Sequence, residues 1–175
     1  MGETSPLRGA TPADIPGIAR VHVQAWRETY AGIVPAAHLA QLSTERSEQV
    51  WLRSLAAPAG RTFVLAPSGQ VQGFVSAGPT RGDLKDFDGE IYALYLLRHL
   101  QGRGHGRRLF AAAVEALRDD THRSMALWVL RDNPTRGFYA HMGGVVVGEQ
   151  PLTIGGEELV EVAYGWPRLS DVTIG

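Results

Sequence analysis

Hydrophobic positions in the N-terminal third recur every three to four residues, a spacing that predicts amphipathic helices. Residues 11–14, Thr-Pro-Ala-Asp, are typical of a helix start, with a hydroxyl cap, a proline in the first turn and an acidic residue after it. Apolar residues follow on one face, so we predict that the first helix ends near Trp26. Two shorter helices are predicted at 35–42 and 43–55.

From residue 62 onward the pattern changes to short runs rich in β-branched and aromatic residues. Pro67-Ser68-Gly69 separates the first two runs and predicts a hairpin, while the glycine- and acid-rich stretch 78–89 is expected to be a mobile loop. Residues 90–97 are almost continuously apolar, which is typical of a central strand covered on both faces. The predicted strands are 62–66, 71–77, 90–97, 125–130, 145–147 and 159–165, the last two around Gly155-Gly156.

Helical patterns also separate the strands of the C-terminal half. A helix is predicted from the glycine-rich stretch 101–106 to Leu117, between two apolar strands, and this order implies a right-handed crossover between parallel strands. Asn133-Pro134 is expected to open a short helix that ends at Met142. The sequence therefore predicts an α/β fold, with a mixed sheet and helices on its faces.

Composition excludes several classes of protein. The 175 residues predict one domain over 1–175, and no apolar run approaches the roughly 18 residues that cross a bilayer. The N-terminus lacks the pattern of a signal peptide, so we expect a cytoplasmic protein with no membrane partner. With no cysteine and no metal-ligand spacing among six histidines, we expect no disulfide, no catalytic thiol and no metal. A net charge of −1 argues against a general nucleic-acid binder.

The stretch 101–106, Gln-Gly-Arg-Gly-His-Gly, joins a strand to a helix start, where unpaired backbone N–H groups and the helix dipole favour an anion. Residues 98–108 carry four arginines and no acidic residue, a local charge of +4, whereas the remaining 13 basic and 18 acidic residues sum to −5. No Lys-Ser/Thr follows as in a P-loop, and Arg107 replaces the last glycine of a dinucleotide fingerprint. An ordinary glycine-rich turn with solvated arginines is the alternative.

Gln101, Gly104 and Gly106 match the fixed positions of Q/R-x-x-G-x-G/A, and in this the chain resembles the GCN5-related N-acetyltransferases, or GNAT family. Residues 90–96 are similar to the family's fourth strand, and 127–139 to its second conserved block. The resemblance extends over nearly the whole chain. It implies the GNAT fold, a central mixed and mostly antiparallel sheet with one parallel crossover and helices on both faces.

The resemblance also implies acetyl-CoA as co-substrate, with the backbone of residues 94–96 on the pantetheine arm and 102–107 on the pyrophosphate. Asn133 would touch the arm or merely cap a helix. Tyr139 would protonate the departing thiolate, or else be a core tyrosine. The residues implied for coenzyme binding are Leu94, Tyr95, Leu96, Gln101, Gly102, Arg103, Gly104, His105, Gly106, Arg107 and Asn133.

An amine must be neutral to attack, yet an alkylammonium of pKa about 10.4 is neutral only about once in 10³–10⁴ at pH 7. Glu90 stands eleven residues before Gln101, where the histone-acetylating branch of the family carries its catalytic glutamate. It is the candidate general base, acting through water, with a solvated strand-edge glutamate as the alternative. A backbone N–H near Leu96 would stabilise the carbonyl oxygen. Without cysteine, direct transfer in a ternary complex and sequential kinetics are favoured.

The acceptor is less well defined by the sequence. Trp26 and Tyr30 lie in the region that forms a wall of the acceptor cleft in other members of the GNAT family, and core packing is the alternative role. The branch that acetylates ribosomal-protein N-termini has a glutamate where this chain has Trp128, which argues against that substrate. A small-molecule or amino-acid-like amine is favoured, and a homodimer is a family-level expectation. Other hypotheses are an enzyme acting on a protein or charged tRNA and, because Asn133 and Tyr139 are six rather than seven residues apart, a non-catalytic acyl-CoA-binding or regulatory module.

Overall fold

The computed structural model describes residues 6–174. Within them, one sheet has the strand order β1-β2-β3-β4-β5-β7-β6. Neighbouring strands are antiparallel except β4 and β5, which are parallel, so the predicted mixed and mostly antiparallel sheet is confirmed. The strands are β1 (Leu7–Gly9), β2 (Arg61–Leu65), β3 (Gly73–Pro79), β4 (Gly89–Leu96), β5 (Met125–Leu130), β6 (Val145–Ile154) and β7 (Glu157–Trp166).

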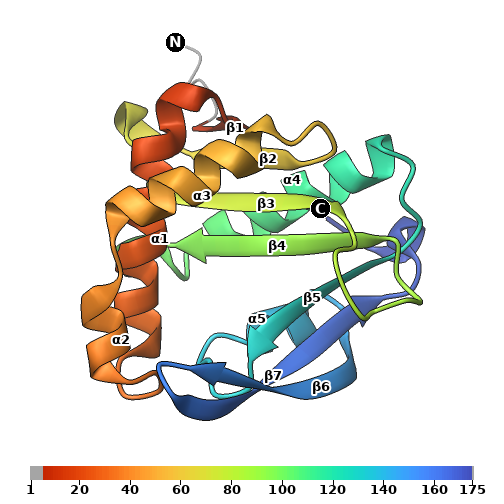
Figure 1. The fold of residues 1–175 in the computed structure, drawn as a ribbon. Coiled ribbons are helices and arrows are strands. Elements are labelled where there is room, and N and C mark those ends of the chain that lie inside the picture. Colours follow the sequence, from red (N-terminus) through yellow and green to blue (C-terminus); the bar gives the residue numbers. More distant parts are fainter. Residues whose placement is uncertain (1–5, 175) are drawn as a thin grey trace.

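Helices cover both faces of the sheet (Figure 1). On one face lie α1 (Ile15–Tyr30) and α3 (Thr44–Ala56), and the short α2 (Ala36–Gln41) follows α1. On the other lie α4 (His105–Asp119) and α5 (Gly137–His141). A hydrophobic core lies on each face of the sheet, because successive side chains of a strand point to opposite faces. In β3, Val75 packs towards α4, while the adjacent Phe74 packs towards α1 and α3.

The helix boundaries differ by more than two residues from the prediction at two places. Helix α1 continues one turn beyond Trp26, because Tyr30 is buried against Leu39 and Leu130 and prolongs the apolar face. Helix α5 begins at Gly137 rather than at Asn133-Pro134. The side-chain oxygen of Asn133 instead accepts hydrogen bonds from the backbone N–H and hydroxyl of Thr135, which makes a local turn before the helix.

The strands also differ in extent. The sequence pattern missed β1, which has only three residues and is held as an edge strand by pairing with β2. The last two strands are longer than predicted and form one hairpin around Gly155-Gly156. The stretch 78–89 is only partly loop, because its first two residues complete β3 and its last begins β4.

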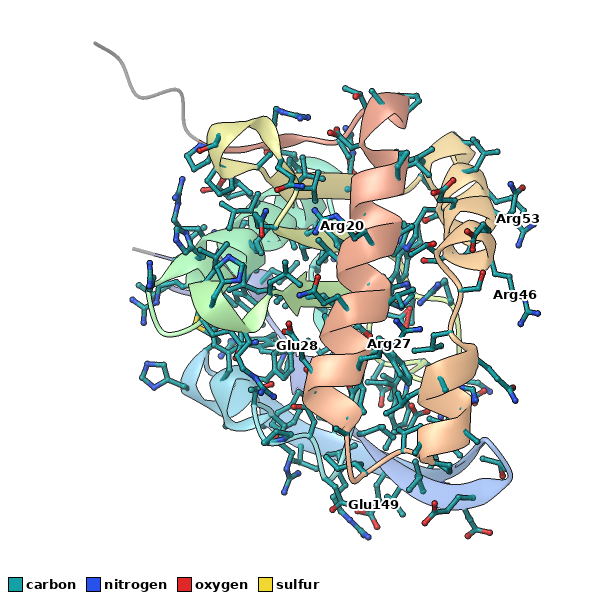
Figure 2. All side chains as sticks on the ribbon, turned by 90° about the vertical axis from the view of Figure 1, so that its left-hand side faces the viewer. Arg20, Arg27, Glu28, Arg46, Arg53 and Glu149 are labelled. Atoms are coloured by element: carbon teal, nitrogen blue, oxygen red, sulfur yellow. The ribbon has the colours of Figure 1, made fainter. Side chains whose placement is uncertain are left out.

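Polar contacts fix the C-terminal half of α1 on two sides. The Glu28 carboxylate accepts the backbone N–H of Arg98 at 3.0 Å, just after β4. Arg27 donates to the carbonyl groups of Leu39 and Leu42 around α2, at 3.2 and 3.0 Å. Figure 2 shows these two side chains leaving α1 on different sides. The helix is therefore tied both to the end of β4 and to α2.

His22 fills the space between α1, α3 and β4. Its ring stacks on Tyr95 with centroids 5.2 Å apart, and its Nδ1 accepts the indole N–H of Trp51 at 3.3 Å. Burial lowers the pKa of His22 from 6.5 to about 4, so the folded protein holds a neutral imidazole near pH 7.

The buried imidazole makes stability depend on pH. Between pH 6.5 and 4 the unfolded chain binds a proton at His22 that the folded chain does not, so stability falls as the pH falls. Relative to His22→Gln, the wild type should lose about 2 kcal/mol of unfolding free energy between pH 7 and pH 5. Urea denaturation at both values measures this, with exposed His99→Gln as control. Parallel pH profiles for the wild type and His22→Gln would contradict it.

Candidate active site

Strands β4 and β5 are joined at one end only. Their paired residues are Gly89 with Met125 and Glu90 with Ala126, and beyond these pairs the two strands separate (Figure 1). The Asp88 carboxylate holds the joined end, because it accepts the backbone N–H of Ser124 at 2.9 Å. Burial raises the pKa of Asp88, but hydrogen bonds from Arg123 and Ser124 outweigh it and leave the pKa below its usual value. Asp88 therefore stays ionised near neutral pH.

Glycine makes the close approach at this end feasible. The backbone N–H of Gly89 donates to the carbonyl of Ser124 at 3.1 Å, and a Cβ on Gly89 would lie 2.8 Å from that same oxygen. A larger residue would push the two strands apart where they must meet. The strands are therefore clamped at this end and open beyond it.

The open side of β4 presents main-chain groups without a strand partner. The backbone N–H of Leu97 donates to the carbonyl of Gln72, on the β3 side, at 3.1 Å. Main-chain groups of successive residues point to opposite sides of a strand, so those of Leu94 and Leu96 point towards β5. The side chain of Gln101 donates to the carbonyl of Leu96 at 3.0 Å. The N–H groups of Leu94 and Leu96 and the carbonyl of Leu94 thus face the space between the strands, where an extended ligand can pair with them.

The turn after β4 offers a second set of backbone donors. Gly102 and Gly104 have φ of +73° and +83°, a conformation that favours glycine, and a Cβ on either would meet open space. Gly104 is the N-cap of α4. The backbone N–H of Arg108 donates to the carbonyl of Gly104 and makes the first hydrogen bond of the helix. The backbone N–H groups of His105 and Gly106 precede that bond in the first turn of α4, where N–H groups lack an acceptor within the helix and can bind an anion.

A pocket of about 530 Å³ lies where these features meet. Its lining brings together most of the residues that the sequence singled out. They are Tyr30, Leu94, Tyr95, Leu96, Gln101, Gly102, Gly104, Gly106, Arg107, Asn133 and Tyr139. A second pocket of about 430 Å³ adjoins it and shares Arg107, His141 and Met142 with it.

Four of the predicted residues lie outside this lining. They are Trp26, Glu90, Arg103 and His105. The indole N–H of Trp26 donates to the Tyr95 hydroxyl at 2.9 Å, so Trp26 braces a pocket residue from behind. His105 begins α4, and its Nδ1 is buried with no hydrogen-bond partner among residues 6–174. The roles predicted for these four residues and for the residues in the lining all stay predictions.

Three tyrosines converge on the pocket from different elements, Tyr30 from α1, Tyr95 from β4 and Tyr139 from α5. Burial raises the pKa of each, and for Tyr95 and Tyr139 the neighbouring Tyr30 adds to the rise. All three therefore keep their phenolic protons near neutral pH. Tyr139 is in the protonation state that a proton donor needs.

Asn133 links two of the pocket walls. Its side-chain nitrogen donates to the Tyr30 hydroxyl at 3.2 Å, and its side-chain oxygen accepts the backbone N–H of Thr135. The phenolic hydrogen of Tyr30 therefore points away from Asn133. Asn133 therefore both forms a turn and supports Tyr30.

Glu90 stands at the last paired position before β4 and β5 separate, and its side chain is only 8% exposed. Arg81, from the β3–β4 connection, donates its Nε to the Glu90 carboxylate at 3.1 Å. The Arg81 guanidinium also lies over the ring of Tyr92, a pocket residue, at 3.7 Å. Sequence reasoning missed Arg81 and Tyr92, because no local motif marks either residue.

The split parallel pair and the glycine turn at the start of α4 define the N-acetyltransferase class that the sequence suggested. A sequence model of the acetyltransferase (GNAT) family matches residues 23–144. The uncharacterized N-acetyltransferase YuaI of Bacillus subtilis is 41% identical over 165 residues, which cover 94% of each protein. The chain therefore belongs to the GNAT family and is an N-acetyltransferase.

Solved structures share the fold at low sequence identity. The PaiA N-acetyltransferase of Thermoplasma acidophilum, in complex with coenzyme A, has a TM-score of 0.68 and 20% identity, covering 89% of this chain and 96% of that one. YncA of Salmonella typhimurium, with its cofactor acetyl-CoA, has a TM-score of 0.71 and 18% identity, covering 95% of each chain. The predicted GNAT fold is thereby confirmed.

Residues 6–174 contain no cluster of three or more histidine, cysteine or acidic residues that could hold a metal ion. No helix in that part of the chain combines the length and the apolar character needed to span a membrane. The cytoplasmic location and the homodimer stay predictions.

The hydrogen bond between Asn133 and Tyr30 should appear as a coupling energy. Asn133→Ala and Tyr30→Phe each remove it, so the double variant should lose about 0.5–1.5 kcal/mol less unfolding free energy than the two single losses summed. Urea denaturation measures the cycle, and Tyr30→Phe with the remote Arg61→Ala should be additive within about 0.5 kcal/mol. An additive Asn133–Tyr30 pair would refute the link.

Proposed function

We propose that the protein transfers the acetyl group of acetyl-CoA to the primary amine of a small, amino-acid-like molecule. The observation that carries the proposal is the unpaired edge of β4, which is followed within a few residues by a glycine turn at the start of α4. A long ligand with a peptide-like arm and a diphosphate matches both parts. The open space in front of Gly102 and Gly104 supports this fit.

Each part of the site has a share in holding the donor. The main-chain groups of Leu94 and Leu96 would pair with the amides of the pantetheine arm as a further strand does. The N–H groups of the turn and of the first turn of α4 would bind the diphosphate, aided by the +4 charge of residues 98–108. Gln101 keeps the turn against the end of β4 through the Leu96 carbonyl.

The reaction forms a bond between the amine nitrogen and the acetyl carbon and breaks the bond from that carbon to sulfur. A main-chain N–H on the open side of β4, at Leu94 or Leu96, would stabilise the carbonyl oxygen as negative charge develops. Glu90 would take the proton of the attacking amine through water, since it lies outside the pocket lining. Tyr139, whose pKa is raised by burial, would supply a proton to the departing thiolate.

The acceptor reaches the donor from the side of α1. Ala25, Thr29 and Tyr30 form this wall of the pocket, and Trp128 of β5 lines it as well. Aromatic and small side chains of this kind suit a small amine better than a wide nucleic-acid surface. A small-molecule acceptor is therefore the first choice over a protein or a charged tRNA.

A direct assay separates an enzyme from a non-catalytic acyl-CoA-binding module. Thiol release from acetyl-CoA can be followed without background because the chain has no cysteine. Release that depends on an added amine, with the acetylated amine identified by mass spectrometry, is the expected result. Tight acetyl-CoA binding without release across a broad amine panel would favour the module.

Gly104 provides the sharpest test of donor binding. Gly104→Asp puts a side chain and a negative charge into the turn, so acetyl-CoA affinity should fall by about 100-fold or more. Gly156 has a matching φ of +81° and open space in the β6–β7 hairpin, so Gly156→Asp is a control with similar backbone strain. Calorimetry should give near-native affinity for the control. Equal affinities for both variants would contradict the assignment of the turn.

Glu90→Gln tests the general base. The variant should bind acetyl-CoA as the wild type does but lose about 10²–10⁴-fold in turnover at pH 7. The loss should shrink at pH 9, where a larger fraction of the amine is already neutral. Initial rates with saturating acetyl-CoA at the two pH values measure this. The same loss at both values would argue that Glu90 has a purely structural role.

A further inference from the structure

We propose that Arg81 binds an acidic group of the acceptor, so that the substrates are amines that also carry a carboxylate. This inference rests on the proposed function, and it concerns the acceptor half of the same site. It starts from the cluster of Arg81, Glu90 and Tyr92.

The guanidinium of Arg81 is held in place by two different contacts. Its Nε donates to the Glu90 carboxylate at 3.1 Å, which fixes one edge of the group. Its flat face lies 3.7 Å from the centre of the Tyr92 ring, and the Tyr92 hydroxyl in turn donates to the carbonyl of Pro79. Such a stack restrains the plane of the guanidinium, so little side-chain freedom is left to lose when a ligand binds.

The outer end of the same group is open. The Arg81 side chain is 61% exposed although it is held at two points. Within residues 6–174 its terminal Nη groups have no hydrogen-bond partner. Two parallel N–H bonds in this geometry match the two oxygens of a carboxylate. Arg81 is therefore an oriented, solvent-facing site for a carboxylate.

The location separates this site from the one proposed for the donor phosphates. Glu90 lies six residues before Leu96 along β4, which is about 20 Å of extended strand. Ile91 packs in the core beneath α4, so the adjacent Glu90 points to the face that carries α1. Arg81 is thus at the other end of β4 from the glycine turn. Its neighbour Tyr92 lines the pocket, so a bound carboxylate would sit at the pocket's edge.

A purely structural role for Arg81 makes a different prediction. A buried carboxylate such as Glu90 needs a positive partner, and Arg81 supplies it. If this were its whole role, removing Arg81 would affect all acceptors alike. A carboxylate site instead predicts a loss confined to acceptors that carry the carboxylate.

The test compares amino acids with the amines left by decarboxylation. The pairs are L-leucine with 3-methylbutylamine, L-phenylalanine with 2-phenylethylamine, and L-serine with 2-aminoethanol. In the wild type, kcat/KM should favour at least one amino acid over its amine by about tenfold or more. Arg81→Gln should abolish that preference, mainly through KM, and Arg81→Lys should restore only part of it. Arg53→Gln, which removes an equal charge from the outer side of α3, should leave the preference intact (Figure 2).

Two outcomes would overturn the proposal. One is a wild-type enzyme that acetylates these amines without preferring any of the amino acids. The other is a preference that survives Arg81→Gln while both members of each pair slow by the same factor. If no acceptor is acetylated at all, the proposed function fails separately. Calorimetry with N-acetyl-leucine and N-acetyl-3-methylbutylamine then tests the carboxylate site. Binding of N-acetyl-leucine to the wild type that weakens about tenfold in Arg81→Gln supports the site. Equal affinity of the wild type and Arg81→Gln for N-acetyl-leucine contradicts it.

Discussion

The one-ended pairing of β4 with β5 is the constraint on which the site depends. Two parallel strands that stay paired would satisfy each other's main-chain groups and leave nothing for a ligand. Here Asp88 and Gly89 hold the strands together at one end, and Gln101 binds the carbonyl of Leu96 at the other. The N–H groups between these two points remain unpaired on the open side. The fold therefore provides an unpaired strand edge in the interior of the sheet.

The α1 side of the pocket is built on the same strand. Tyr95 alternates with Leu94 and Leu96, so its ring lies on the α1 side while their main-chain groups face the open space. Trp26 donates to the Tyr95 hydroxyl, and Asn133 donates to that of Tyr30. Helix α1, β4 and the segment before α5 are thereby joined around one pocket. In the proposed reaction, the same few residues of β4 would position both donor and acceptor.

Much of this could be read from the sequence, because its signals are local. The strand 90–97, the turn 101–106 and the helix after it are defined by composition and spacing alone. Gln101, Gly104 and Gly106 mark the family, and they also occupy the pocket lining. Local pattern was sufficient wherever a residue's role depends on its immediate neighbours.

The remainder depends on contacts between distant segments, which no local pattern encodes. Asn133 and Tyr30 are 103 residues apart, and Asp88 meets Ser124 across 36 residues. The last turn of α1 is helical because Tyr30 packs against Leu39 and Leu130. The loop arginine Arg81 meets Glu90 and Tyr92 only in the folded protein. The missed strand β1 exists because β2 offers it a pairing edge.

A crystal structure of the protein with acetyl-CoA would show whether β4 and the glycine turn hold the donor. We expect the diphosphate oxygens within hydrogen-bond distance of the amides of residues 102–107, and the pantetheine arm paired with the main chain of Leu94 and Leu96. Density for the diphosphate at another surface, or an arm that makes no contact with the open side of β4, would contradict it.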